Sequence, residues 1–245
     1  MDLKKQNIDN LTSLWQVINQ RASTYVIENV FDYGIINYSD WPNRLWFKKT
    51  PEQTHLDLAK KIISSSSTKI TIPYWEINGN DYYLLLENNG FVKVLEQVGM
   101  YIDLSKSDFK PSEINLNKVK DERTALLWES LFQKAFNYKI DHKLLLNSYD
   151  QVDYLIAYDN TSPVGTALMY HTGNQIVGIH SMGIIPEMRR KGYAEKMMHS
   201  MLSEAVKKGY SYATLQASEM GKNLYLKLGF EEQFLMRNYT LPKHA

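Results

Sequence analysis

The chain has 245 residues, a length that suits two ordinary domains. It carries 28 lysines and arginines against 27 acidic residues, so it lacks the positive excess typical of proteins that bind nucleic acids or membrane surfaces. A hydrophobic content of 44% allows a buried core and excludes global disorder. The sequence contains no cysteine, which excludes disulfides and thiolate metal sites and favours a cytoplasmic location.

The N-terminal part of the chain, 1–110, alternates between helical and strand-like patterns. One helix is marked by apolar residues three or four positions apart, namely Leu11, Leu14, Trp15, Ile18 and Ala22. The next elements are expected in the order strand 29–38, helix 51–64, strand 69–75, a helix containing Tyr83, and strand 92–104. The segment Lys106–Ser112, which contains Pro111, is the predicted boundary between a domain at 1–110 and a domain at 111–245.

The C-terminal part, 111–245, shows a regular order of elements. We expect a strand at 114–119, helices at 121–136 and 141–147, strands at 152–159, 164–171 and 175–185, a helix at 192–208, a strand at 212–217, a helix at 221–228 and a strand at 233–241. This order predicts a domain of the α/β (α+β) class, with a mixed, mostly antiparallel sheet flanked by helices.

A short internal similarity links the two parts of the chain. The segment from Tyr83 to Gly90-Phe91 and the segment from Tyr225 to Gly229-Phe230 both predict a tyrosine-bearing helix that turns through Gly-Phe into a strand. Either a duplicated half-domain or chance explains a match this short, and both explanations stay open.

A basic turn precedes the helix expected at 192–208. It contains Arg189, Arg190 and Lys191, followed by Gly192. The first amides of a helix have no acceptors within the helix, and together with the helix dipole they favour anionic oxygens. Glycine allows a ligand to approach the backbone closely. The turn is therefore a candidate phosphate site, although a solvated surface turn has the same appearance. The motifs of P-loops and of dinucleotide-binding folds are absent from the sequence.

In this context the C-terminal part resembles the GNAT superfamily of acyl-CoA-dependent N-acyltransferases. The family signature, [Q/R]-x-x-G-x-[G/A] between a strand and a helix, is matched by Arg189, Gly192 and Ala194. A second family motif, a tyrosine shortly before Leu-Gly-Phe, is matched by Tyr225. The N-terminal part resembles the family only loosely: it contains the helix–Gly–Phe–strand pattern but no basic glycine turn.

The resemblance implies that acetyl-CoA is the cosubstrate and lies in a splay between the strands at 176–185 and 212–217. The diphosphate would bind to backbone amides of the basic turn, and the pantetheine arm would pair with the preceding strand. Ser218 stands where many family members have an asparagine that contacts the cofactor. The residues implied for cofactor binding are Met182, Gly183, Ile184, Arg189, Arg190, Lys191, Gly192, Tyr193, Ala194 and Ser218.

The resemblance also implies catalytic roles. Tyr225 would protonate the departing thiolate as general acid, and His180 would deprotonate the amine as general base. The alternatives are a tyrosine that packs in the core, a structural histidine, and Glu187 as the base. The histidines show no metal-binding spacing and there is no GxSxG motif, so no metal is predicted.

The predicted function is N-acetyl transfer from acetyl-CoA to an amine of unknown identity. The alternatives are a non-catalytic acyl-CoA-binding regulator and an acyltransferase that uses a longer acyl chain. The expected partner is the amine substrate, with a second copy in a homodimer as a further candidate; no nucleic acid or membrane is expected. The N-terminal domain is predicted to bind no CoA and to form a wall of the acceptor cleft. Its candidate pocket residues, most of them expected in the core, are Trp41, Trp46, Phe47, Tyr74 and Trp75.

Overall fold

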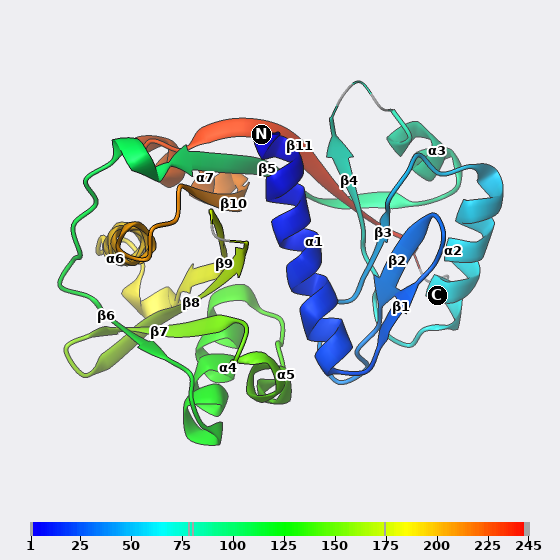
Figure 1. Ribbon diagram of the computed structural model, residues 1–245. Coiled ribbons are helices and arrows are strands. Elements are labelled where there is room, and N and C mark those ends of the chain that lie inside the picture. Colours follow the sequence, from blue (N-terminus) through cyan, green and yellow to red (C-terminus); the bar gives the residue numbers. More distant parts are fainter. Residues whose placement is uncertain (1, 78, 80, 174, 243–245) are drawn as a thin grey trace.

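The computed structural model describes residues 2–77, 79, 81–173 and 175–242 (Figure 1). The helices are α1 (Leu3–Arg21), α2 (Gln53–Ser65), α3 (Tyr83–Asn88), α4 (Glu122–Phe136), α5 (His142–Ser148), α6 (Tyr193–Lys207) and α7 (Glu219–Lys227), with short 3-10 turns η1 (Leu104–Lys106) and η2 (Pro186–Met188). Within the described residues, no helix combines the length and the apolar character that a membrane crossing requires.

The strands form one large and one small sheet. They are β1 (Tyr25–Ile27), β2 (Phe31–Gly34), β3 (Arg44–Phe47), β4 (Ile72–Glu76), β5 (Val92–Asp103), β6 (Asn115–Lys118), β7 (Asp153–Asp159), β8 (Ser162–Thr172), β9 (Ile176–Ile184), β10 (Tyr212–Ser218) and β11 (Glu231–Thr240). The large sheet has the order β4-β11-β5-β10-β9-β8-β7-β6, and β1-β2-β3 form the small one. Among the described residues of the large sheet, only β9 and β10 pair in parallel. The predicted fold class is thereby confirmed.

The large sheet crosses the predicted domain boundary. β5 precedes that boundary in the chain, yet it lies between β10 and β11 of the C-terminal part. In turn, β11 pairs with β4 on its other side. Figure 1 shows β5 and β11 running together past the N-terminal end of α1. The two parts of the chain therefore share one sheet.

Helices cover both faces of this sheet. α1, α4 and α5 pack on one face, over Tyr154 and Ile156 of β7. α6 and α7 pack on the other face, over Leu155 and Ala157 of the same strand. The alternation follows from the two-residue period of side chains along a strand. A third core joins α2 and α3 to the small sheet and β4.

The predicted elements agree with the observed ones, with two exceptions close to the N-terminus. The strand expected at 29–38 is only the short β2, and β1 and β3 were not expected. β3 has the sequence Arg-Leu-Trp-Phe, of which Leu45, Trp46 and Phe47 are all buried. A run this short, without alternating buried and exposed positions, does not show the two-residue period that predicts a strand.

The internal similarity corresponds to two equivalent turns. The Phe91 amide donates to the Leu86 carbonyl at 3.1 Å, and the Phe230 amide donates to the Tyr225 carbonyl at 3.0 Å. Gly90 and Gly229 both have φ in the left-handed region, which closes the helices in the same way. The two strands that follow, β5 and β11, pair with each other. When the two segments are aligned on these turns, the residue equivalent to Tyr225 is Leu86 rather than Tyr83.

Candidate functional site

The two parallel strands separate partway along their length. β9 and β10 pair only from Ile176 to Gly178 and from Tyr212 to Thr214. Beyond that point β10 stays paired with β5 as far as Ser218, and β9 stays paired with β8 as far as Ile184. Each strand is thus held by its outer neighbour, and a splay opens between their carboxyl ends. Its position agrees with the predicted one.

A bulge in β9 lies at the mouth of this splay. His180 pairs with Leu168 and Gly183 pairs with Thr166, so Ser181 and Met182 together face a single residue of β8. Ser181 has a φ of 50°. A bulge of this kind redirects the side chains and carbonyls of its strand. Gly183 is required by packing, because a Cβ there would come within 2.5 Å of the Phe136 ring.

The start of α6 is open to a ligand. Gly192 caps the helix with a φ of 78°, and no side chain caps it. The first amide with a helical acceptor is that of Lys196, which donates to the Gly192 carbonyl at 3.1 Å. Among the described residues, the amides from Arg190 to Glu195 have no acceptor. A Cβ on Gly192 would meet nothing within 4 Å. These unpaired amides are a ready site for an anionic oxygen.

The side chains of the basic turn divide into anchors and exposed cations. Arg189 donates through Nε to the Ile184 carbonyl at 3.1 Å and through a terminal nitrogen to the Ala135 carbonyl at 2.8 Å, so it ties the turn to β9 and α4. The Tyr193 hydroxyl donates to Asp159 at the end of β7. Arg190 and Lys191 are exposed. Ala194, one residue into the helix, is small enough to leave the amides accessible.

A cavity of about 190 Å³ continues from the splay. Its wall on the strand side includes His180, Met182, Ser218 and Tyr225. A second wall comes from the first part of the chain, the end of α4 and the loop after it; it includes Leu11, Trp15, Trp41, Arg44, Phe136 and Tyr138. The structure thus brings both predicted catalytic residues to one cavity, whereas Glu187 is exposed and does not line it.

Of the aromatic residues predicted from the N-terminal part, Trp41 lines the cavity. The others, Trp46, Phe47, Tyr74 and Trp75, are buried in the core, as was expected of most of them. Ser218 is the N-cap of α7, and its hydroxyl accepts a hydrogen bond from the Gly221 amide at 3.3 Å.

Tyr225 is buried against the cavity. Its ring packs edge-on against Phe230 with centroids 5.8 Å apart, and its hydroxyl has no hydrogen-bond partner among the described residues. Burial raises the pKa of Tyr225 to about 12. The hydroxyl therefore stays protonated at neutral pH and is available as a donor to a ligand.

His180 is held by the N-terminal helix. Its Nε2 lies 3.1 Å from Asn10 Oδ1, and Asn10 Nδ2 donates in turn to the Tyr170 carbonyl at 3.0 Å. Burial lowers the pKa of His180 to about 4, although a hydrogen bond with Gln216 acts in the opposite direction. The imidazole is therefore neutral at physiological pH.

A second asparagine of α1 extends this polar network. The Gln216 side-chain amide donates to Asn7 Oδ1 at 2.7 Å, and Asn7 Nδ2 donates to the Met100 carbonyl at 3.0 Å. Sequence reasoning missed both asparagines. A signal was present, because Asn7 and Asn10 continue the apolar stripe of Leu11, Leu14 and Ile18 onto the buried face of the helix.

His180 makes a pH-dependent contribution to stability. The unfolded imidazole has a pKa near 6.5, so its depressed folded-state pKa favours the native state above pH 6.5, and this stability is lost as pH falls toward 4. The full contribution is about 3 kcal/mol. We expect His180→Gln to flatten the decrease in the free energy of unfolding between pH 7 and pH 4, measured with urea. His171→Gln, at an exposed strand position, should retain the wild-type slope; equal slopes for all three proteins would contradict the assignment.

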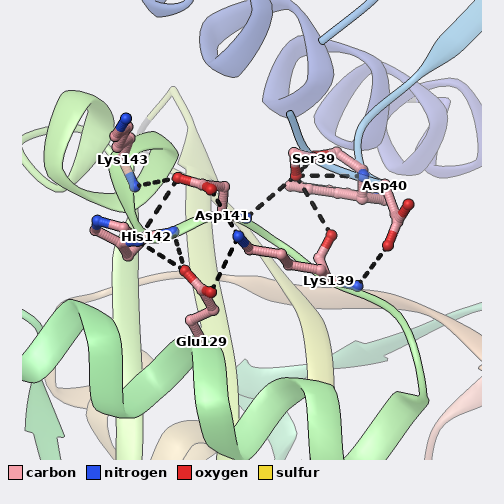
Figure 2. Close-up of polar contacts among 8 residues, drawn as sticks. Ser39, Asp40, Glu129, Lys139, Asp141, His142 and Lys143 are labelled. Carbon is pink, nitrogen blue, oxygen red and sulfur yellow. Dashed lines mark hydrogen bonds and ion pairs between the residues drawn. The ribbon is translucent and has the colours of Figure 1, made fainter. Parts of the chain in front are cut away.

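The cavity wall from the first part of the chain is clamped to the loop after α4 (Figure 2). The Lys139 amide donates to the Asp40 carboxylate at 2.8 Å, and the Asp40 amide donates to the Lys139 carbonyl at 2.9 Å. The Asp141 amide donates to Ser39 Oγ at 3.2 Å. These bonds fix the loop that carries Trp41 against the loop that carries Tyr138.

Three potential metal ligands lie beside this clamp. Glu129, Asp141 and His142 offer ligand atoms within 4.8 Å of one another. The Lys139 ammonium lies between the two carboxylates, 2.9 Å from Asp141 and 3.3 Å from Glu129, as Figure 2 shows. The lysine supplies the positive charge that the carboxylates need, so the cluster is explained as an ion-pair network.

Comparisons with known proteins identify a matching family model and similar folds. The family model described as the acetyltransferase (GNAT) family matches residues 121–230. A GCN5-related N-acetyltransferase from Kribbella flavida has a TM-score of 0.72 at 12% identity, covering 95% of each chain. One from Sphaerobacter thermophilus has a TM-score of 0.61 at 14% identity, covering 88% of this chain and 78% of its own.

A third structure, described as a tandem GNAT protein from the clavulanic acid biosynthesis pathway, has a TM-score of 0.58 at 10% identity. It matches 88% of this chain and 79% of its own. Among curated protein sequences, none matches this chain. At these identities the structural likenesses establish the fold, and the family match places the basic turn and Tyr225 within the matched segment.

Proposed function

We propose that this chain, whose residues 121–230 form a GNAT acetyltransferase domain, transfers the acetyl group of acetyl-CoA directly to an amine. The proposal is carried by a site in three parts: the splay between β9 and β10, the uncapped start of α6, and the cavity beside the splay that Tyr225 lines. An anionic cofactor with a long arm and a thioester end matches these parts. The absence of cysteine agrees with a cytoplasmic enzyme.

In this proposal, the amides from Arg190 to Glu195 bind the diphosphate, and Arg190 and Lys191 add positive charge around it. Arg189 acts by positioning the turn, since its guanidinium is engaged by two carbonyls. The edge of β9 from Met182 to Ile184 accepts the pantetheine arm as an added strand. Ser218 lies at the rim of the cavity, within the splay.

The amine nitrogen attacks the thioester carbonyl, forming the new C–N bond as the C–S bond breaks. The Tyr225 hydroxyl donates its proton to the departing sulfur, which leaves as a thiol. The proton lost by the amine passes to His180, directly or through water. Because the imidazole is neutral and its pKa is about 4, it acts as a transient acceptor, and the proton then returns to solvent.

Residues 1–110 are proposed to be a degenerate GNAT-like domain that binds no CoA. The equivalent turns of α3 and α7 support the duplication, and the fold shared with a tandem GNAT protein agrees with it. Leu86 stands at the position of Tyr225, so the first domain lacks the acid. Its role is to supply the acceptor wall of the cavity.

The function is tested by mixing the purified protein with acetyl-CoA and a panel of amines and measuring released thiol. Thiol release that depends on an amine, with acetylated amine detected by mass spectrometry, is the expected result. Binding of acetyl-CoA without turnover on any amine would favour a regulatory module. A preference for butyryl-CoA or longer thioesters would favour an acyltransferase of longer chains.

Gly192→Ala is expected to weaken CoA binding by roughly tenfold or more, a loss of at least about 1.4 kcal/mol, because the added methyl group occupies the space above the amides. The matched control is Gly209→Ala at the other end of α6. Gly192 and Gly209 have φ values of 78° and 79° and open space around them, so each variant should cost about 1 kcal/mol of stability. Calorimetry with CoA should separate the two variants; identical dissociation constants would contradict the proposed phosphate site.

A further inference from the structure

The acceptor wall of the cavity contains a cation that the proposed acetyl transfer does not use. Arg44 opens β3, and its guanidinium lies over the Trp15 ring, 5.6 Å from the centroid. One terminal nitrogen donates to the Asn43 carbonyl at 3.0 Å. The Nε atom is buried and has no hydrogen-bond partner among the described residues.

No negative charge balances Arg44 within the described part of the chain. None of the described residues that line the cavity is an aspartate or a glutamate. Arg44 also forms no ion pair with any carboxylate of the described residues. Burial lowers the pKa of Arg44 to about 10, and its electrostatic neighbour is Tyr138. The guanidinium remains charged at neutral pH, and an uncompensated charge withdrawn from water is costly unless a ligand pairs with it.

Apart from the Tyr138 hydroxyl, the side chains around Arg44 on this wall are apolar. Leu11, Trp15, Trp41 and Phe136 surround the guanidinium side of the cavity. A single charge among apolar side chains on one side of the cavity suits a ligand with one charged end and an apolar body. The planar fork of a guanidinium matches a carboxylate through two parallel hydrogen bonds, and here it has an unpaired Nε to offer.

We propose that the acceptor is a small amine that carries a carboxylate, of the apolar α-amino acid type, and that Arg44 binds this carboxylate. The inference rests on the acetyl transfer proposed above and names its substrate class. A carboxylate on Arg44 leaves the amine within the same cavity as Tyr225 and His180. A phosphate dianion is disfavoured because the cavity wall offers one cation for two charges.

The inference is tested first by binding, which does not require turnover. Calorimetry in the presence of CoA compares N-acetyl-leucine, which has the carboxylate, with N-acetyl-leucinamide, which lacks it. The wild type is expected to bind the carboxylate at least tenfold more tightly. Arg44→Gln should remove this preference, and Arg44→Lys should restore part of it because lysine keeps the charge without the fork. Arg123→Gln, on the exposed surface of α4, is the matched control and should behave as wild type.

Turnover then separates this inference from the proposed function. Leucine is expected to give a higher kcat/KM than 3-methylbutylamine, its decarboxylated counterpart, and Arg44→Gln should raise KM for leucine more than it lowers kcat.

If no amine releases thiol while carboxylate binding still depends on Arg44, acetyl transfer fails and the carboxylate site stands. The inference is overturned if the wild type does not distinguish carboxylate from amide, if Arg44→Gln keeps the preference, or if O-phosphoethanolamine binds more tightly than leucine. If Arg44→Gln lacks the far-ultraviolet circular dichroism of the folded protein, the test is decided by whether Arg44→Lys keeps part of the preference for the carboxylate.

Discussion

Replacing Tyr225 with phenylalanine is expected to lower kcat by roughly 10²–10⁴-fold, the usual value of a positioned general acid. The substitution removes only the hydroxyl, so the ring still packs against Phe230. Because the hydroxyl has no partner among the described residues, no hydrogen bond of the folded chain is lost with it, and the melting temperature should stay within a few degrees. CoA affinity should also be preserved, since the amides at the start of α6 are unaffected.

The control for this variant is Tyr149→Phe, a tyrosine that is 46% exposed and lies outside the cavity. It should retain the wild-type rate. The pH profile offers a second check: burial raises the pKa of Tyr225 to about 12, so the wild-type rate should show no fall from this group near pH 10, where an ordinary tyrosine ionises. A Tyr225→Phe rate within threefold of wild type would remove the acid role.

The elements around this site could be predicted because their signals are local. Gly192 before an apolar stripe at helical spacing marks the start of α6, and Gly229-Phe230 marks the end of α7. The roles of side chains were less accessible. Arg189 matches the family signature, yet its guanidinium bonds to carbonyls of Ala135 and Ile184, which only the fold brings together.

Apart from Trp41, the residues of the acceptor wall could not be predicted, because its contacts join residues far apart in the chain. Asn10 and His180 are separated by 170 positions, and Asp40 and Lys139 by 99. Periodicity reports which face of an element is buried, but it does not report what covers that face. Arg44 was missed for the same reason: its significance lies in the lack of a carboxylate near it in the described structure, which a sequence cannot display.

The shared sheet has a larger consequence: the piece 111–245 alone is expected not to fold. β5 pairs with β10 along the whole length of that strand and with β11 on its other side, so its removal leaves both strands without partners in the middle of the sheet. Met100, Ile102 and Leu104 also leave the core that contains Tyr225. Burial of each contributes about 2 kcal/mol, and three such losses are comparable with the roughly 5–15 kcal/mol that stabilise a whole protein.

Co-expression of 1–110 with 111–245 provides the control, because the cut between Lys110 and Pro111 lies in an exposed segment and leaves every strand pair intact. The two pieces should elute together as a 1:1 complex with the circular dichroism of the intact chain. The piece 111–245 alone should show no cooperative thermal transition and poorly dispersed amide resonances. A cooperative transition from that piece would mean that β10 and β11 can close the gap by pairing with each other, and β5 would then be an addition to a self-sufficient domain. His180 also contacts Asn10 of α1, which the piece 111–245 lacks. If that piece folds, its activity would therefore show how far the site depends on the first part of the chain.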